Sequence, residues 1–514
     1  MKRYHIAIIF LGLLALGFVL AINPEPKKIT KKFFPEIELD INTPAFRKSK
    51  GFTNYQELIS FLNELQTAHS DVMTITYIGE SQKGKAIPLV TLNKGEAKGK
   101  VRVWLQGGLH GDEMASTEGV LYMLDRLLND KSYRYMLDKL EIRLVPMANI
   151  DGYEKENRYA ANGLDLNRDQ TKLNITESRS LKQAFSDFNA EVAVDFHEYR
   201  PYRKDYTKLS TFGVTSRYDA MFMYSGNLNV PENVRKYTKD KFVTDAELVL
   251  QKAGIKYRDY LTTSKVLGDI HFNEGSNNAR SSATSYALSN CISSLIEIRG
   301  VALGRTSFKR RVNAAFLIGM SYLKSAYDNG PEVKQVLAEG AQWKSDAVVR
   351  CTKKIEQQSI TFIDIETCEE IALDAIVHNA SASIATLSRV RPAAYILEKE
   401  QTELVRKLKV LGLNVQKLSA DRELEVESYS VIDYQKEGEK YEGIYRQKVS
   451  TQVRKETRTI SAGSYIIYLD QENASLAIEV LEPEAPNSFV SFHVLETSLG
   501  DKLPLYRYLK IEKI

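Results

Sequence analysis

Residues Val101–Glu118 have the sequence VRVWLQGGLHGDEMASTE, which combines a strand, a turn and the start of a helix. The alternating pattern over 101–106 is typical of a half-buried β-strand. Gly107 and Gly108 then interrupt the strand, because glycine allows a tight turn. After the turn, apolar residues recur at helical spacing over 120–128. The pattern predicts one strand–turn–helix unit of an α/β sheet.

The turn carries two side chains that zinc commonly binds. His110 and Glu113 stand three residues apart at the carboxyl end of the predicted strand, where open α/β sheets build their sites. An imidazole and a carboxylate at this spacing reach one ion and leave room for a third ligand. His-x-x-Glu also occurs by chance in solvated loops, so the metal hypothesis depends on the rest of the chain.

Further strands and helices follow in alternation. An amphipathic helix and a hairpin are expected over 53–65 and 72–92, apolar strands over 141–149, 192–196 and 295–298, and helices near 237–253 and 308–327. Strands that alternate with helices predict an α/β fold with a central, mostly parallel mixed sheet flanked by helices. In such a sheet the strand ends that carry polar residues converge on one pocket.

Two strands end in, or contain, polar residues that suit a catalytic zinc site. His197 closes the strand 192–196 and is a candidate third ligand, which leaves a fourth position for water. A lone histidine at a strand end is more often simply hydrogen bonded. Glu297 lies inside an apolar strand, where a carboxylate needs a partner or a function unless it faces solvent on an edge strand. Its functional interpretation is the general base that takes a proton from zinc-bound water.

A polar loop supplies the remaining candidates. A zinc-bound histidine usually donates its other ring proton to a carboxylate, and Asp165 is a candidate for that role. Asn167 and Arg168 form an amide–guanidinium pair that can hold a carboxylate at several points, or can simply lie on the surface. Arg158 is a fixed cation that can stabilise an oxyanion.

In order and spacing, these motifs resemble the zinc metallocarboxypeptidases of the carboxypeptidase A type over about Gly51–Tyr327. The resemblance rests on His110–Glu113, Asn149–Gly152, Arg158 with Gly163–Arg168, Asp195–His197 and Leu295–Glu297. It implies one Zn²⁺ per chain on His110, Glu113 and His197. It also implies Arg158 as oxyanion stabiliser, Asn167 and Arg168 as binders of the substrate's terminal carboxylate, and Glu297 as base and acid.

Three departures from the family pattern stand out. Ile150 replaces the proline of the family's Asn-Pro-Asp-Gly turn. Glu198 follows the third ligand, where many members carry a small residue. The family's mobile, substrate-contacting tyrosine has no clear counterpart, because Tyr286 lies too close to Glu297 in the sequence.

The main functional hypothesis is a zinc carboxypeptidase that hydrolyses the C-terminal bond of a peptide or peptide-like substrate with a free carboxyl end. One alternative is a zinc amidase or acylase that acts on cell-wall peptides or N-acyl amino acids. The Asn167–Arg168 pair favours an acid-terminated substrate in both cases. The other alternative is a catalytically inactive binding protein on the same scaffold, and the retention of Arg158 and Glu297 argues against it.

The termini and the charge complete the expected organisation. The net charge of +4 is small for 514 residues and argues against nucleic acid as the main partner. Lys2 and Arg3 precede an apolar run over 6–22, which predicts a signal peptide or an N-terminal anchor at 1–22 and export to the periplasm or the cell exterior. Membrane contact is expected only through this segment if it stays uncleaved. A linker is expected over 23–45 and the catalytic domain over 46–335.

A smaller β-rich domain is expected over 344–514. Strand patterns lie at 361–365, 394–397, 414–418, 424–432 and 465–468, with one helix at 400–411. From Arg391 onward the chain resembles the extra domain of some bacterial family members, so an exported bacterial member is expected. Cys291 is expected to be a buried free thiol, whereas Cys351 and Cys368 could form a disulfide.

Overall fold

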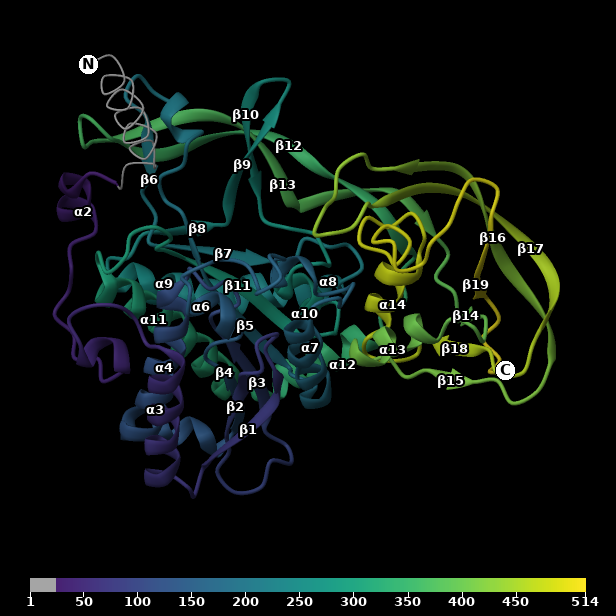
Figure 1. Cartoon of the computed structure of the whole chain (residues 1–514), viewed down its shortest axis with the longest axis horizontal. Helices are drawn as coiled ribbons and strands as arrows, with labels where there is room; N and C mark the ends of the chain where they lie inside the picture. Colours follow the sequence, from purple (N-terminus) through teal and green to yellow (C-terminus); the bar gives the residue numbers. More distant parts are fainter. Residues whose placement is uncertain (1–24) are drawn as a thin grey trace, which may run out of the picture.

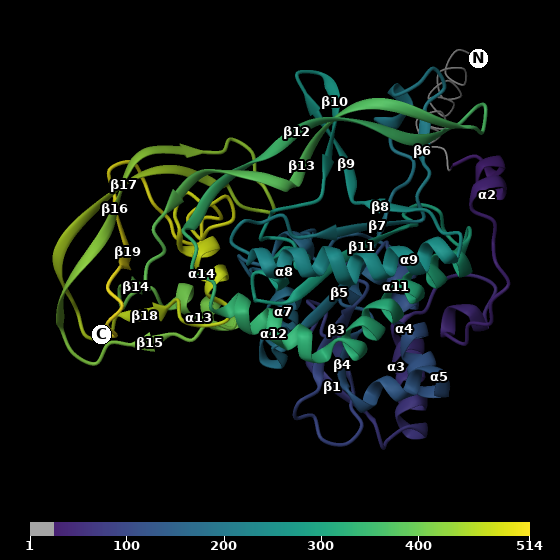
Figure 2. The same ribbon diagram turned by 180° about the vertical axis from the view of Figure 1, so that it is seen from behind.

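The computed structural model describes residues 25–514, and its largest layer is an eight-stranded mixed sheet with helices on both faces (Figures 1 and 2). The strand order is β1-β2-β4-β3-β5-β11-β7-β8. The strands are β1 (Met73–Glu80), β2 (Ala86–Leu92), β3 (Val101–Gln106), β4 (Leu140–Val145), β5 (Val192–Tyr199), β7 (Ala220–Tyr224), β8 (Tyr257–Asp259) and β11 (Ile292–Arg299). The predicted signal peptide or anchor at 1–22 lies outside the described residues.

The centre of this sheet is parallel. Strands β4, β3, β5 and β11 run in one direction, whereas β1, β2 and β4 pair antiparallel at one side and β7 pairs antiparallel with β11 at the other. The prediction of a mostly parallel mixed sheet is therefore confirmed. The register pairs Glu297 of β11 with His197 of β5, which puts both residues at the same level of the sheet.

Helices bury both faces of the sheet. The main ones are α3 (Tyr55–Ala68), α4 (Met114–Asn129), α7 (Thr176–Phe188), α10 (Ser282–Ala287), α11 (Phe308–Asp328) and α12 (Gly330–Ala341). The helix expected near 237–253 consists of α8 (Glu232–Tyr237), a π-helical turn over Thr238–Val243 and α9 (Thr244–Lys252). Short helical turns are α5 (Lys131–Arg134), α6 (Ile150–Tyr153) and the 3-10 turns at Tyr135–Asp138, Leu166–Arg168 and Tyr206–Lys208.

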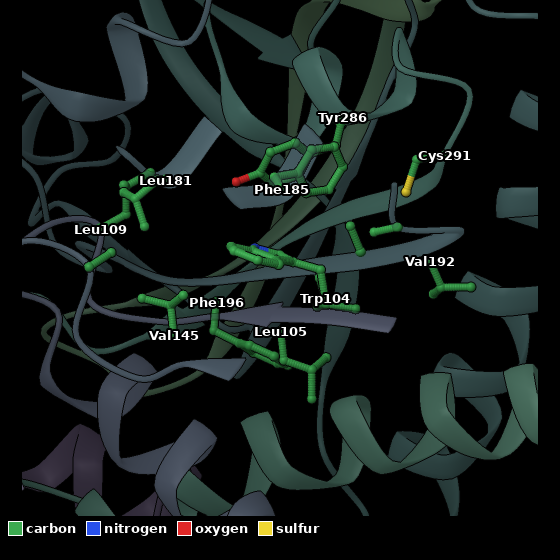
Figure 3. Packing of buried hydrophobic residues seen from close by; sticks show 14 of the residues in the cluster. Trp104, Leu105, Leu109, Val145, Leu181, Phe185, Val192, Phe196, Tyr286 and Cys291 are labelled. Carbon is green, nitrogen blue, oxygen red and sulfur yellow. The ribbon is translucent and has the colours of Figure 1, made fainter. Parts of the chain in front are cut away.

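Aromatic packing fixes α7 and α10 on one face of the sheet (Figure 3). The Phe185 ring stacks on Tyr286 with centroids 4.0 Å apart and meets Trp104 of β3 edge-on at 5.7 Å. Tyr286 is therefore a core residue, since its side chain is 1% exposed. Cys291 is buried and free, as expected.

The segment expected to be a linker is ordered against the body of the protein. Helix α2 (Lys27–Phe33) and a 3-10 turn at Pro44–Arg47 lie within it. Glu25 forms a buried ion pair with Arg299 at the end of β11 and accepts a hydrogen bond from Thr215 at 2.5 Å. The Arg299 guanidinium also lies 3.8 Å from the centroid of the Phe34 ring. Residues 25–45 are therefore held on the body of the protein by contacts such as those with β11.

A long hairpin from the expected C-terminal domain pairs with strands of the expected catalytic domain. Strands β12 (Ala347–Asp364) and β13 (Glu370–Arg389) run over the catalytic part of the molecule (Figure 1). They form a five-stranded sheet, β6-β12-β13-β10-β9, with β6 (Val214–Ser216), β9 (Leu261–Val266) and β10 (Asp269–Glu274). The region after residue 344 is thus built into the earlier region through shared strands. Cys351 and Cys368 both remain free.

The remaining residues form a six-stranded antiparallel sheet, β15-β18-β14-β19-β16-β17. Its elements are β14 (Ala394–Leu397), α13 (Thr402–Val410), β15 (Gln416–Lys417), β16 (Arg422–Lys436), β17 (Gln447–Ile460), β18 (Tyr465–Tyr468), α14 (Ala474–Leu481) and β19 (Lys502–Tyr508). The prediction of a β-rich C-terminal part is confirmed. Within residues 25–514, no helix is both long enough and apolar enough to cross a membrane.

Candidate functional site

Three buried side chains converge at the carboxyl ends of β3 and β5. His110 and Glu113 follow β3 in the turn into α4, and His197 lies on β5. Their ligand atoms all lie within 4.8 Å of one another. The two Nδ1 atoms of His110 and His197 are 3.0 Å apart, and each lies 2.7–2.9 Å from a Glu113 carboxylate oxygen. This is a donor set of two imidazoles and one carboxylate.

The outer nitrogens of both histidines are held by carboxylates. His110 Nε2 lies 3.0 Å from Asp165 Oδ1, and His197 Nε2 lies 2.9 Å from Asp195 Oδ2. Because each carboxylate accepts the Nε2 proton, the Nδ1 lone pairs point toward one another and toward Glu113. Two facing lone pairs and a buried carboxylate fit a divalent cation, and this donor set is typical of catalytic zinc.

Glycine allows the ligand turn to approach the neighbouring loop closely. A Cβ atom on Gly111 would lie 2.1 Å from the carbonyl carbon of Gly152, in the turn that follows β4. Asn149 closes that turn, since its Oδ1 accepts from Gly152 N and its Nδ2 donates to the carbonyl of Arg158 at 3.3 Å. The turn therefore fixes the backbone from which Arg158 reaches the ligands.

Asp165 connects the ligands with the polar loop. Besides His110, it accepts hydrogen bonds from Arg158 Nη2 at 2.8 Å and from the backbone N–H of Asn167 at 2.7 Å. Arg158 Nη1 also lies 3.5 Å from Glu113 Oε1. One carboxylate thus orients a histidine and a guanidinium, and holds the loop that contains Asn167.

Asn167 and Arg168 line the cavity above the ligands. The Asn167 carbonyl Oδ1 accepts a hydrogen bond from Ser282 N at 2.8 Å, so the amide Nδ2 is left as a donor. Arg168 Nη1 donates to the backbone carbonyl of Asn167 at 2.9 Å. In the described part of the chain, no carboxylate lies within 4.0 Å of the Arg168 guanidinium. Both side chains have donor capacity for an anion.

Glu297 lines the same cavity. Burial, reinforced by the nearby Glu113 charge, raises the pKa of Glu297 to about 7. A carboxyl group with a pKa near neutrality can accept and return a proton. Tyr260 lines the cavity too, and burial together with the Glu297 charge raises the pKa of Tyr260 to about 12, so its hydroxyl stays protonated.

Glu198 is engaged by an ion pair, although its neighbour in sequence is His197. Arg311 donates to Glu198 Oε1 at 2.5 and 2.9 Å, and the backbone N–H of Ala115 donates to Oε2 at 3.0 Å. The extra carboxylate therefore ties β5 to α11 and to the start of α4. Its charge is balanced within the fold.

All eight residues proposed from the sequence lie at this one site, but several neighbours were missed. Asp195 stands two residues before His197, on the same face of β5, and this spacing was a usable signal. Arg280, Lys353 and Tyr260 also line the cavity, and the Glu442 carboxylate accepts a hydrogen bond from Asp165 N at 2.8 Å. These four come from distant segments, and no local pattern marks them.

Comparisons with known proteins agree with this geometry. A profile of the zinc carboxypeptidase family matches residues 58–309. The chain is 30% identical to carboxypeptidase 2 of Trichophyton equinum over 477 residues, which cover 89% of this chain and 87% of that protein. It is 29% identical to carboxypeptidase 2 of Trichophyton rubrum over 508 residues, 92% of each chain. Because of this coverage, the similarity extends into the region after residue 344.

Two solved structures are also similar. Carboxypeptidase A from Helicoverpa armigera aligns with a TM-score of 0.43 and 15% identity, over 59% of this chain and 81% of that chain. A metallo-carboxypeptidase from Burkholderia cenocepacia aligns with a TM-score of 0.43 and 15% identity, over 54% of this chain and 70% of that chain.

Proposed function

The chain belongs to the zinc carboxypeptidase family and is a metallocarboxypeptidase, and from that premise we propose the role of each residue of its site. His110, Glu113 and His197 hold one Zn²⁺ per chain. The observation that carries this assignment is the convergence of both Nδ1 atoms on Glu113 while carboxylates hold both Nε2 atoms. When bound, the ion supplies a Lewis acid that polarises the scissile carbonyl and acidifies a water molecule.

The chain's own groups handle the substrate and the proton. Asn167 Nδ2 and Arg168 hold the terminal carboxylate, so that the last peptide bond lies beside the ligands. Glu297 accepts the proton of the attacking water and returns it to the leaving amine. Arg158, oriented by Asp165, stabilises the negative charge that develops on the carbonyl oxygen. The substrate is a peptide with a free carboxyl end.

Matched free-acid and amidated peptides test the carboxylate role of Arg168. Arg168→Ala should weaken cleavage of the free-acid peptide by about 2–5 kcal/mol in transition-state binding, because it removes one partner of a charged contact. Cleavage of the amidated peptide should barely change. Arg406→Ala, at an exposed site on α13, is the control. An equal loss on both peptides would assign Arg168 a structural role instead.

The same assay distinguishes a carboxypeptidase from an acylase or amidase. Mass analysis should find products that are shorter by one C-terminal residue. Hydrolysis of N-acyl amino acids or wall fragments without cleavage of ordinary peptides would favour an acylase or amidase.

We also propose that this is an exported bacterial member of the family. The basic residues Lys2 and Arg3 before the apolar run 6–22 support export. Cell fractionation should find the protein in the periplasm or outside the cell. Full-length protein found only in the cytoplasm would contradict this proposal.

A further inference from the structure

The cavity beside the ligands has more cations than the proposed mechanism uses. Its volume is about 570 Å³. Arg168, Arg200, Arg280 and Lys353 all line it, and within residues 25–514 none of them has a carboxylate within 4.0 Å. Of the carboxylates that line the same cavity, Glu198 is paired with Arg311. Asp112 and Glu297 are the other carboxylates in the lining, and the four cations outnumber them. The cavity therefore favours anions.

Arg280 lies directly against the carboxylate-binding loop. Its carbonyl accepts a hydrogen bond from Gln170 N at 3.2 Å, and Ser282, two residues later, donates to the Asn167 side chain. The Arg280 guanidinium lies 5.3 Å from the centroid of the Tyr441 ring, and its Nε is buried without a hydrogen-bond partner. A buried, unpartnered guanidinium nitrogen costs free energy unless a ligand supplies an acceptor.

Lys353 reaches the cavity from β12, in the region after residue 344. Its Nζ donates to Asn273 Oδ1 at 2.9 Å, and Asn277 Nδ2 lies 3.2 Å from Cys351 Sγ, which ties β12 to the segment that contains Arg280. Burial lowers the pKa of Lys353, and the Arg280 charge lowers it further. Arg280 and Lys353 thus line the same cavity, and within residues 25–514 neither has a carboxylate within 4.0 Å.

We propose that Arg280 and Lys353 bind the side-chain carboxylate of a C-terminal aspartate or glutamate, so that this enzyme removes acidic C-terminal residues. The inference rests on the proposed function, in which Asn167 and Arg168 hold the terminal carboxylate. An acidic last residue carries two carboxylates, and the cavity offers one cationic contact for each. Glu274, the neighbouring acid on β10, does not compete, because it pairs with Arg258 at 2.7 Å.

A peptide panel that differs only in the last residue tests this preference. With zinc-loaded enzyme, kcat/KM should be about 10- to 100-fold higher for Glu than for Gln and for Asp than for Asn, because each amide loses a charged hydrogen bond. Peptides ending in Lys should be the poorest. Equal rates for Glu and Gln, or a preference for Lys or Phe, would overturn the inference and leave the carboxypeptidase function intact. If no peptide loses a residue, the proposed function fails first.

Variants at Lys353 test whether this residue causes the preference for acidic C-terminal residues. Lys353→Met should lower kcat/KM for the Glu-terminated peptide by about 10-fold or more relative to the Gln-terminated peptide. Lys353→Glu should shift the preference toward Lys. Lys354→Met, at an exposed neighbouring position on β12, is the matched control and should keep the wild-type ratio. A Glu/Gln ratio that Lys353→Met leaves unchanged would overturn the assignment.

Discussion

Glu297 is the residue whose chemistry the mechanism needs most. Glu297→Gln keeps the shape of the side chain but cannot accept a proton, so kcat should fall by at least about two orders of magnitude. Zinc content and folding should stay nearly unchanged, because Glu297 lies outside the proposed ligand set. Steady-state kinetics and elemental analysis on the same preparation measure both quantities.

Two results would contradict this role. If the variant loses zinc, Glu297 is a ligand and one of the three assigned ligands is wrong. If it keeps both zinc and normal turnover, the proton is carried by another group. Glu198 is a poor substitute, because Arg311 and Ala115 N already bind both of its oxygens.

The buried Lys182 side chain predicts how the free energy of unfolding depends on pH. Burial lowers the pKa of Lys182 to about 7, and within residues 25–514 its Nζ donates only to Ser285 and Ser289. The unfolded chain therefore binds a proton between about pH 7 and pH 10 that the folded chain does not bind, so the stability contributed by this group rises with pH. Lys182→Met removes this rise. Between about pH 7.5 and pH 9, wild type should gain on the order of 2 kcal/mol relative to the variant in denaturant titrations. A constant difference would mean that Lys182 is charged in the folded state.

Residue-level prediction succeeds where a residue's role follows from its place on a strand. His197 and Glu297 could be predicted because each interrupts an apolar strand near its carboxyl end. Asp195 could have been predicted in the same way from its two-residue spacing to His197. Arg280 and Lys353 could not be predicted, because they are 73 residues apart in the sequence. They line one cavity only because β12 packs against the β10–α10 segment.

At the scale of elements, the loop between β16 and β17 packs against the loop that contains Asp165. Glu442 accepts a hydrogen bond from Asp165 N, and Gly443 lies close to Leu164. This loop therefore packs against the segment that contains Asp165, Asn167 and Arg168. Because the loop connects two strands of the C-terminal sheet, this sheet supports the wall of the cavity that Asn167 and Arg168 line.

Glu442→Ala should make the Asp165–Arg168 segment more mobile, because it removes the hydrogen bond from Asp165 N. It changes none of the residues proposed for catalysis. KM for free-acid peptides should rise about 3- to 10-fold, the effect of losing one hydrogen bond of about 1 kcal/mol, with a smaller change in kcat. Glu439→Ala, exposed in the same loop, is the control. If the two variants have equal kinetics, the contact does not position the loop.

The elements that could be predicted are those with strong local periodicity. The pattern at 465–468 matches β18 and the pattern at 394–397 matches β14. The extent of β12 and β13 could not be predicted, because most of both strands is exposed or only partly buried. The ordering of 25–45 depends on partners such as Arg299, far along the chain.

At the scale of the molecule, the catalytic and C-terminal regions share one hydrophobic core. Buried residues from β14, α13 and α14 belong to the same cluster as those of the eight-stranded sheet. Lys407 of α13 donates to the carbonyls of Lys172 and Leu173, and Asn227 and Asn229 bind Glu479 of α14. We therefore expect the proposed catalytic domain 46–335 to depend on the rest of the chain.

A truncated chain ending at residue 343 tests this dependence. It should be insoluble or should melt well below the full chain, because truncation exposes the apolar surface now covered by α13 and α14. Thermal melting and limited proteolysis are the measurements. A truncated chain with full-length stability and activity would show that 46–335 is an independent domain.

We propose that His110, Glu113 and His197 hold a zinc ion with which this chain removes a residue from a peptide's carboxyl end. The most direct measurement is zinc content together with mass analysis of a free-acid peptide, for wild type, chelator-treated wild type and His197→Ala. Wild type should contain about one zinc per chain and should remove single C-terminal residues. If this zinc assignment holds, activity should be lost on chelation and recover on adding zinc, and His197→Ala should have sharply reduced zinc and activity. Full zinc occupancy in His197→Ala, or undiminished hydrolysis by the metal-free protein, would contradict it.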